Sequence, residues 1–183
     1  MQTARMPAAF IGHGSPMNTL ERNRYTEAWR ELGRKLPRPR AILCISAHWF
    51  IKATAVTAME RPRVIHDFYG FPQELFAFDW AQRFDADVQR MMATDPGTLA
   101  GAPGHPDYAM SAPTPEHFMP LYYFAGLCAQ GGEPAKAFVM GGAMGSLTMT
   151  GFTLGMDWNA PVAEAEGEGA TLPASTPPEQ TNL

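Results

Sequence analysis

Two short apolar runs, each stopped abruptly by polar residues, most constrain how this chain can fold. Residues 8–11 end at Gly12, residues 41–45 end just as sharply, and each run has the length of a buried strand bounded by turn formers. Apolar residues recur at helical spacing between the runs, and Asn18 with Glu21 forms a candidate capping pair for that helix. Strand, helix and strand in this order predict an α/β fold, with a mostly parallel sheet flanked by helices.

The second half of the chain continues with helical and strand patterns. Residues 75–92 carry apolar side chains at helical spacing. Thr114, followed by a proline, is expected to open another helix that runs to about Ala129 and ends at two glycines. Residues 137–140 and 147–154 are predicted to form strands.

The composition indicates one globular domain followed by a polar tail. The chain has 183 residues, of which 45% are hydrophobic, and both values are ordinary for a single globular domain. After residue 159 the sequence contains no aromatic residue and is rich in Ala, Glu, Pro and Thr. We therefore expect a domain over residues 1–159 and a disordered tail over residues 160–183.

Charge and hydropathy exclude two classes of partner. The net charge of −4 gives the chain no basic surface of the kind that nucleic-acid binders carry. Its apolar runs are far shorter than the ~18 residues of a membrane span, and its first residues do not follow the pattern of a signal peptide. Cys44 and Cys128 lie in apolar stretches and form no ligand pair. These features predict a cytoplasmic protein without nucleic-acid or membrane partners, and none of them sets an oligomeric state.

Two histidines follow the two predicted strands. His13 lies between Gly12 and Gly14, and His48 follows the run at residues 41–45. Because the carboxyl ends of parallel strands meet at one edge of a sheet, we expect the two imidazoles to project from the same rim. Neutral imidazole is the commonest metal ligand in proteins, so this pair predicts a metal site. The alternative is that each histidine only caps its strand or bonds to a loop carbonyl.

The other three histidines are less constrained by their surroundings. His117 is expected in the first turn of the helix opened by Thr114, as a metal ligand or as part of the capping loop. His66 lies in an aromatic segment and could be a ligand, a substrate contact or a loop anchor. His105 is expected to be a loop residue that faces solvent.

Five segments of the chain resemble parts of a single family. They read GHGSPM from Gly12, SAHW from Ser46, HDFYGFP from His66, PTPEHFMPL from Pro113 and GSLTM from Gly145. The family is the 4,5-DOPA extradiol dioxygenase-like family, which lies within the class III extradiol ring-cleavage dioxygenases. Successive matching histidines are 35 and 69 residues apart, at positions 13, 48 and 117, which makes a chance match improbable.

The resemblance implies an enzyme, a metal and a substrate class. The implied enzyme is a metal-dependent extradiol ring-cleavage dioxygenase, an oxidoreductase of aromatic compound metabolism. Its implied cofactor is Fe(II) or Zn(II), with His13, His48 and His117 as the metal ligands. Its implied partners are a small aromatic diol, of the catechol or DOPA type, and O2.

The aromatic segment is expected to bind the substrate ring, through His66, Phe68 and Tyr69. After this segment the chain departs from the family pattern, because an Asp-His-Gly motif and a Gly-Ser-Gly-Asn segment are missing. The departure predicts an internal deletion near residues 77–79. It also removes the histidines that supply acid–base chemistry in the family, so the sequence assigns no catalytic residue.

This departure leaves two other functions open. One is a non-catalytic remnant of the family that binds Zn(II) through the same three histidines. The other sets the resemblance aside and interprets the chain as a small α/β hydrolase-like domain that uses the GHGSP turn to bind an anion. Hydrolysis of a phosphate ester that is insensitive to a chelator would favour this last interpretation.

Overall fold

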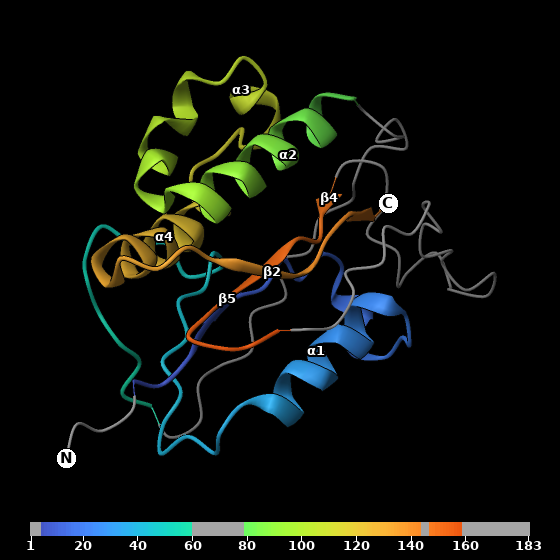
Figure 1. Ribbon diagram of the computed structural model, residues 1–183, viewed down its shortest axis with the longest axis vertical. Helices are drawn as coiled ribbons and strands as arrows, with labels where there is room; N and C mark the ends of the chain where they lie inside the picture. The colour runs from blue at the N-terminus through green and yellow to red at the C-terminus, as the bar shows by residue number, and fades with distance from the viewer. Residues whose placement is uncertain (1–4, 60–78, 144–146, 159–183) are drawn as a thin grey trace.

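The computed structural model describes residues 5–59, 79–143 and 147–158, and these contain four α-helices, two 3-10 helices and five short strands (Figure 1). In chain order the elements are β1 (Ala8–Phe10), η1 (Pro16–Thr19), α1 (Arg24–Lys35), α2 (Asp79–Thr94), η2 (Pro96–Gly104), α3 (Tyr108–Ser111), α4 (Met119–Gly131), β2 (Lys136–Val139), β3 (Gly142–Ala143), β4 (Leu147–Thr148) and β5 (Gly151–Leu154).

The central sheet is antiparallel, so the prediction of a mostly parallel sheet was wrong. Its three strands lie in the order β1-β5-β2, and both neighbours of β5 run opposite to it. Ala8 pairs with Leu154 and Phe10 with Phe152, which places the first strand of the described residues beside the last. β3 and β4 form a separate two-stranded antiparallel pair. The mixture of helices and strands is α/β in content, as predicted.

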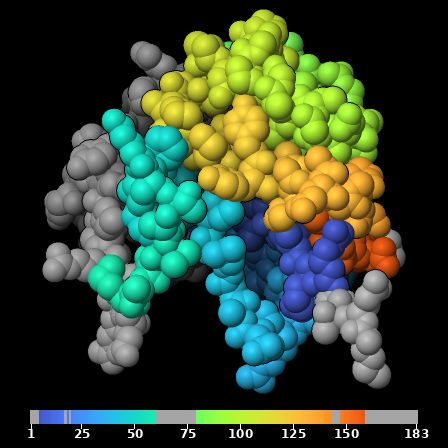
Figure 2. All heavy atoms as spheres, turned by 90° about the vertical axis from the view of Figure 1, so that its left-hand side faces the viewer, coloured from blue at the N-terminus to red at the C-terminus, as the bar shows by residue number. Residues whose placement is uncertain are grey.

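The second predicted strand, residues 41–45, is an exposed coil. Ile42 is 83% exposed and Leu43 is 80% exposed, and no strand is formed between residues 36 and 59. Figure 2 shows this part of the chain, coloured cyan to teal, running over the outside of the molecule. An apolar run of this length forms a strand only when a neighbouring strand pairs with it. Here the partner of β1 is β5, so the predicted βαβ unit is not formed.

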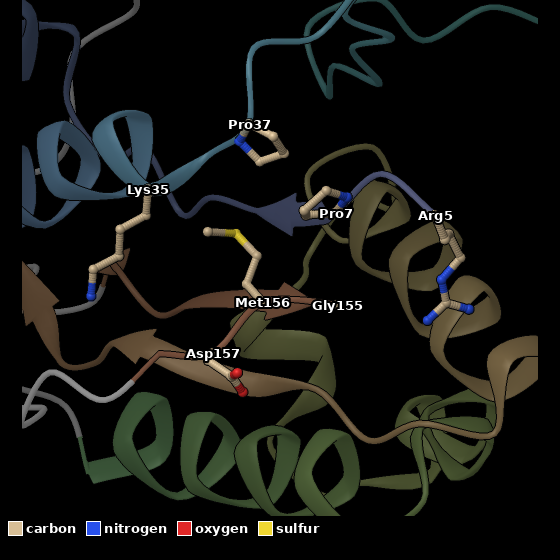
Figure 3. A pocket seen from close by; sticks show the side chains of 7 residues that line it. All are labelled: Arg5, Pro7, Lys35, Pro37, Gly155, Met156 and Asp157. Carbon is tan, nitrogen blue, oxygen red and sulfur yellow. The ribbon is translucent and has the colours of Figure 1, made fainter. Parts of the chain in front are cut away.

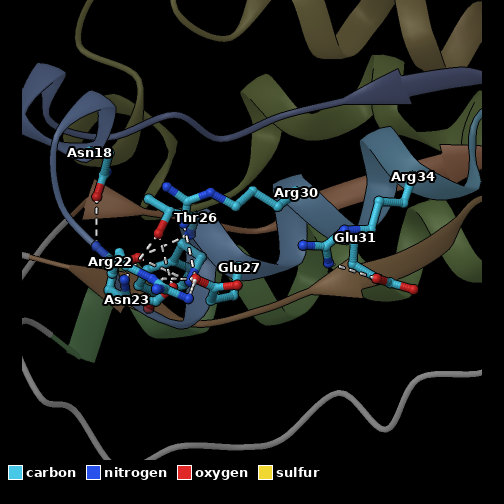
Figure 4. Close-up of polar contacts among 9 residues, drawn as sticks. Asn18, Arg22, Asn23, Thr26, Glu27, Arg30, Glu31 and Arg34 are labelled. Carbon is cyan, nitrogen blue, oxygen red and sulfur yellow. Dashed lines mark hydrogen bonds and ion pairs between the residues drawn. The ribbon is translucent and has the colours of Figure 1, made fainter.

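Helix α1 begins five residues later than the predicted capping pair would place it. Its N-cap is Asn23, whose side chain accepts hydrogen bonds from the backbone N–H groups of Tyr25 and Thr26, while Thr26 completes a capping box. Figure 4 shows this cap, together with the ion pairs that Glu27 forms with Arg22 and Arg30 on the exposed side of the helix. The predicted cap at Asn18 was wrong because Asn18 bonds to a different loop.

The helices cover both faces of the sheet. α1 lies on one side, and α2, α3 and α4 lie on the other (Figure 1). The larger core lies between α2, η2, α4 and β5, and the smaller core lies between α1 and β2. The largest side chains of the larger core are Phe84, Val88, Met92, Leu99, Leu121, Phe124 and Phe152. Helix α4 ends at Gly132, whose φ of 61° is left-handed, so the predicted end of this helix is confirmed.

Several sequence predictions fall on residues that the structure does not describe. These are the tail at 160–183, the aromatic segment with His66, Phe68 and Tyr69, and residues 77 and 78 of the predicted deletion site. Within the described residues, no helix is both long enough and apolar enough to cross a membrane.

Candidate metal centre

Three histidines from distant parts of the chain meet at one place. The ring centroids of His13 and His48 are 5.2 Å apart, and those of His48 and His117 are 5.1 Å apart. The Nε2 atoms of His13 and His48 are separated by 3.3 Å. The structure therefore brings together the three histidines that the sequence selected as metal ligands, although the parallel strands expected to place two of them are not formed.

His13 lies on a loop that only glycines can build. Gly12 carries no Cβ, and a Cβ there would come within 2.9 Å of the Thr150 carbonyl oxygen. Gly14 has a φ of +56°, and a Cβ on it would collide with the Met149 sulfur. The two glycines thus allow the loop to rest directly on the chain between β4 and β5.

Asn18 holds the same loop by a hydrogen bond to its backbone, a role that the sequence did not reveal. Its side-chain amide donates to the His13 carbonyl oxygen over 3.0 Å, and its own oxygen accepts from Asn23 over 2.8 Å. Figure 4 draws Asn18 beside the N-terminal end of α1, so the cap of this helix and the His13 loop form one hydrogen-bonded unit. The signal in the sequence was an asparagine five positions after His13, which we interpreted as a helix cap.

The imidazole of His13 is oriented by the backbone. Its Nδ1 atom lies 2.9 Å from the Gly14 carbonyl oxygen, an acceptor, so Nδ1 carries the hydrogen and Nε2 faces His48. Partial loss of hydration lowers the pKa of His13, the Gly14 carbonyl opposes that shift, and the neighbouring His48 and His117 add to it. A lowered pKa favours the neutral imidazole, which is the form that binds metals.

His117 lies just before helix α4, beside an acidic neighbour. The helix begins at Met119, so the prediction that Thr114 caps it and that His117 lies in its first turn was wrong. Residues 113–118 form bends and turns instead. Pro120 lies in the first turn of α4, and because it has no N–H it could not donate to the Glu116 carbonyl if the helix began earlier. The Nδ1 atom of His117 lies 3.5 Å from Oε1 of Glu116.

Glu116 is itself held by Thr114, whose hydroxyl donates to the same Oε1 atom. This hydrogen bond is the main reason that the pKa of Glu116 lies below its ordinary value, with a smaller contribution from His117. Glu116 is therefore a carboxylate at neutral pH and accepts hydrogen bonds only.

The histidine nitrogens of this cluster are not arranged as a complete set of metal ligands in the structure. Among the described residues, no group of three or more His, Cys, Asp or Glu side chains is placed to hold a metal ion as it stands. His13 and His48 face each other through nitrogen, whereas the ring of His117 meets His48 at an interplanar angle of 88°. The cluster is thus a pair of nitrogen donors with a third imidazole beside it.

His105 is not the solvent-facing loop residue that the sequence predicted. Its side chain is only 12% exposed, and its Nε2 atom lies 3.0 Å from Oδ2 of Asp87 on α2. Its Nδ1 atom accepts a hydrogen bond from the backbone N–H of Asp107. Both nitrogens of His105 are therefore used to fix the loop after η2 against α2.

A surface pocket lies elsewhere, and the four histidines among the described residues do not line it. Figure 3 shows Arg5, Lys35 and Asp157 around its mouth, near the start of β1 and the end of β5. All three charges are engaged with neighbours: Arg5 pairs with Glu133, Asp157 with Lys136, and Lys35 lies 4.3 Å from the centre of the Trp158 ring. Each charged side chain that lines this pocket among the described residues thus has a partner within the molecule.

Comparison with known proteins relates parts of the chain to one group of enzymes. The chain is 63% identical over 76 residues to the protein named 4,5-DOPA dioxygenase extradiol from Escherichia coli (strain K12), and this match covers 42% of the chain and 28% of the relative. The protein of the same name from Beta vulgaris is 37% identical over 78 residues, covering 39% of the chain and 28% of the relative. Segments of this chain are homologous to 4,5-DOPA extradiol dioxygenases. The resemblance found in the sequence motifs is thereby confirmed.

A more distant relative extends the homology to other dioxygenases. The protein named dioxygenase tasH from Hapsidospora irregularis is 29% identical over 120 residues, which is 60% of the chain and 36% of the relative. The matches span only about a third of the length of these curated dioxygenases, or less. No protein-family model matches the chain.

A solved structure shares the fold. The crystal structure of uncharacterized protein JW3007 from Escherichia coli K12 superposes with a TM-score of 0.61 at 25% sequence identity, over 82% of this chain and 100% of that chain. The chain therefore shares a recognisable arrangement of elements with that structure, and the central sheet of its described residues is small and antiparallel.

Proposed function

We propose that this chain binds Fe(II) or Zn(II) through His13, His48 and His117, and that the metal site takes a catechol-type diol and O2 for extradiol ring cleavage. The observation that supports this most is the convergence of the three imidazoles, with 5.2 Å and 5.1 Å between successive ring centroids. Homology to proteins named 4,5-DOPA dioxygenase extradiol supplies the reaction class.

The spacing of the two facing nitrogens suits a metal ion. Zinc–nitrogen bonds of about 2.0–2.1 Å at a tetrahedral angle place two ligand nitrogens roughly 3.3–3.4 Å apart. The Nε2 atoms of His13 and His48 are 3.3 Å apart. His117 would have to move toward this pair to complete the set, and because its side chain is 59% exposed, little packing opposes that movement.

The residues of the chain have distinct tasks at such a site. A bound metal would lower the pKa of the diol hydroxyls and would bring the diol and O2 to neighbouring positions. The Gly14 carbonyl holds His13 with Nε2 directed to the site, and Asn18 fixes the loop that carries it. His66, Phe68 and Tyr69 are proposed to contact the aromatic ring.

Ring cleavage can be tested directly on the full chain. The protein is purified without metal, reconstituted with Fe(II) under anaerobic conditions, and mixed with DOPA or catechol and O2. We expect a yellow ring-fission product that is absent when His13→Ala replaces the wild-type chain. Absence of product across a panel of catechols, from protein that has bound its metal, would contradict the proposed activity.

One observation favours the second candidate, a zinc-binding remnant without turnover. The histidines expected to supply acid–base chemistry are absent from the sequence, and His105 has both nitrogens occupied by Asp87 and Asp107. For the remnant we expect one Zn(II) per chain that His13→Ala abolishes, with no ring fission under any condition. Metal analysis and the cleavage assay together separate the two functions.

A further inference from the structure

Two successive polar contacts link Thr114, Glu116 and the Nδ1 atom of His117. The Thr114 hydroxyl donates to Oε1 of Glu116, and the same oxygen lies 3.5 Å from Nδ1 of His117. This separation is an ion-pair contact, longer than the roughly 2.7–3.2 Å between donor and acceptor in an N–H···O hydrogen bond. Glu116 is an acceptor only, so the contact is satisfied only when Nδ1 of His117 carries the hydrogen.

A closer contact of Nδ1 with an oxygen, in this case a hydrogen bond, occurs at His13. There the Gly14 carbonyl oxygen lies 2.9 Å from Nδ1, and Nε2 is the atom that faces His48. Two of the three imidazoles thus have Nδ1 against an oxygen acceptor of their own segment. In each case the protonation of Nδ1 leaves the lone pair on Nε2.

We propose that Glu116 is a positioning residue for His117: it fixes the Nδ1–H tautomer and thereby presents the Nε2 lone pair to the metal. The inference rests on the proposed function, since it assumes that His117 is a ligand. Metal-binding histidines generally donate their second N–H to a carboxylate or a carbonyl, and these partners raise ligand basicity and affinity. Thr114 contributes by holding the Glu116 oxygen that faces His117.

The exposure of the two side chains explains why such a tether is useful. The His117 side chain is 59% exposed, while that of Glu116 is 28% exposed. An exposed imidazole exchanges between rotamers and tautomers, and ordering it costs free energy when a metal binds. Glu116 is less exposed than His117 and is hydrogen-bonded by Thr114, so its contact with His117 reduces this cost.

The tautomer of His117 tests the inference without any metal. Histidine-15N-labelled full-length protein is prepared metal-free at neutral pH, and long-range 1H–15N correlation spectra report which nitrogen carries the hydrogen. The His117 signals are assigned by their loss in His117→Asn. We expect Nδ1–H in the wild type, retention of that form in Glu116→Gln, whose amide oxygen still accepts, and its loss in Glu116→Ala.

Affinity for Zn(II), measured by competition with a chromophoric chelator, is the second readout. Glu116→Ala is expected to bind Zn(II) about tenfold more weakly than the wild type, and Glu116→Gln to show a smaller loss. Glu133→Ala is the matched control, because it removes the same charge just beyond the opposite end of α4. Its affinity should equal that of the wild type.

The outcomes separate this inference from the proposed function. An Nε2–H tautomer in the wild type, or equal Zn(II) affinity for Glu116→Ala and Glu133→Ala, would overturn the role of Glu116 while leaving the metal site intact. A wild-type chain that binds no Zn(II) would overturn the proposed function, and the role of Glu116 toward a metal with it. The tautomer spectra would still decide whether Glu116 controls His117.

Discussion

The Nε2 atoms of His13 and His48 face each other across 3.3 Å, although the segments that carry them are not paired as strands. His13 is fixed by glycines and by Asn18, while His48 lies on an exposed turn whose backbone N–H is bonded to the Ser46 hydroxyl. The pair is therefore made by two local turns rather than by a sheet edge.

Replacing His48 by alanine should abolish tight metal binding without unfolding the chain. His48 is exposed, so its truncation removes little packing. The site, however, loses one of its two facing nitrogens. Changes to outer partners of a ligand cost about 10–100-fold in affinity, so loss of the ligand itself should cost more. Zn(II) titration and thermal unfolding of His48→Ala measure both effects. Unchanged Zn(II) affinity would show that His48 is not a metal ligand.

His105→Ala should have the reverse effect. The substitution removes the bonds to Asp87 and Asp107 and the ring contact with Phe84, whose centroid is 5.2 Å away. Each hydrogen bond that is lost typically costs about 0.5–1.5 kcal/mol of unfolding free energy. Zn(II) affinity should stay at the wild-type value. A marked loss of metal binding in folded His105→Ala would show that His105 belongs to the metal site.

The residues of the candidate site could be predicted from the sequence better than the sheet could. His13, His48 and His117 were selected by their motifs, and the structure brings all three together. Residues 41–45 were wrongly predicted as a strand, because an apolar run says nothing about which strand will be its neighbour. That neighbour is decided by contacts distant in sequence, here between β1 and β5.

Short-range chemistry explains the remaining errors. Asn23 rather than Asn18 caps α1, because Asn18 bonds to the His13 carbonyl, and no local pattern distinguishes two asparagines five positions apart. His105 lies in a Gly- and Pro-rich stretch that looks solvated. Its burial depends on Asp87, which lies 18 residues earlier in the sequence.

Gly14→Ala should destabilise the fold, and Gly33→Ala should not. Gly14 has a φ of +56° and lies against Met149, whereas Gly33 is in α1 with nothing near its Cβ position. A left-handed residue other than glycine costs about 1–2 kcal/mol, while alanine in place of an exposed helical glycine gains up to about 1 kcal/mol. Urea denaturation of both variants measures these opposite changes. Equal effects would contradict the loop geometry assigned to Gly14.

Leu43→Ala should leave stability almost unchanged. Leu43 is 80% exposed, so its truncation removes little buried surface and should change the unfolding free energy by less than about 0.5 kcal/mol. Leu99→Ala is the matched control: Leu99 is fully buried, and such truncations cost about 2–5 kcal/mol. If the two variants lost similar stability, residues 41–45 would be part of the core in solution, as the sequence alone predicted.

The buried carboxyl of Asp85 should make stability fall as the pH rises. Burial raises the pKa of Asp85 above its ordinary value of 3.8, against the opposing hydrogen bonds from Thr150 and Gln89. The folded chain therefore holds this proton more tightly than the unfolded chain. Between the ordinary and the raised pKa, stability decreases with increasing pH, and the penalty persists at neutral pH. Asp85→Asn, which can still accept both hydrogen bonds, should be more stable than the wild type at pH 7, with the difference vanishing below pH 4.

Asp107→Asn provides the control of opposite sign. The Arg83 guanidinium, bonded to both oxygens of Asp107, lowers the pKa of that carboxyl, so its contribution to stability is present above the ordinary pKa and is lost as the pH falls. Asp107→Asn should therefore be less stable than the wild type at pH 7, with the difference shrinking toward pH 3. Urea midpoints measured from pH 3 to pH 7 give both curves. Because the two substitutions are chemically identical, parallel pH dependences for Asp85→Asn and Asp107→Asn would contradict the opposite environments that the structure assigns to these carboxyl groups.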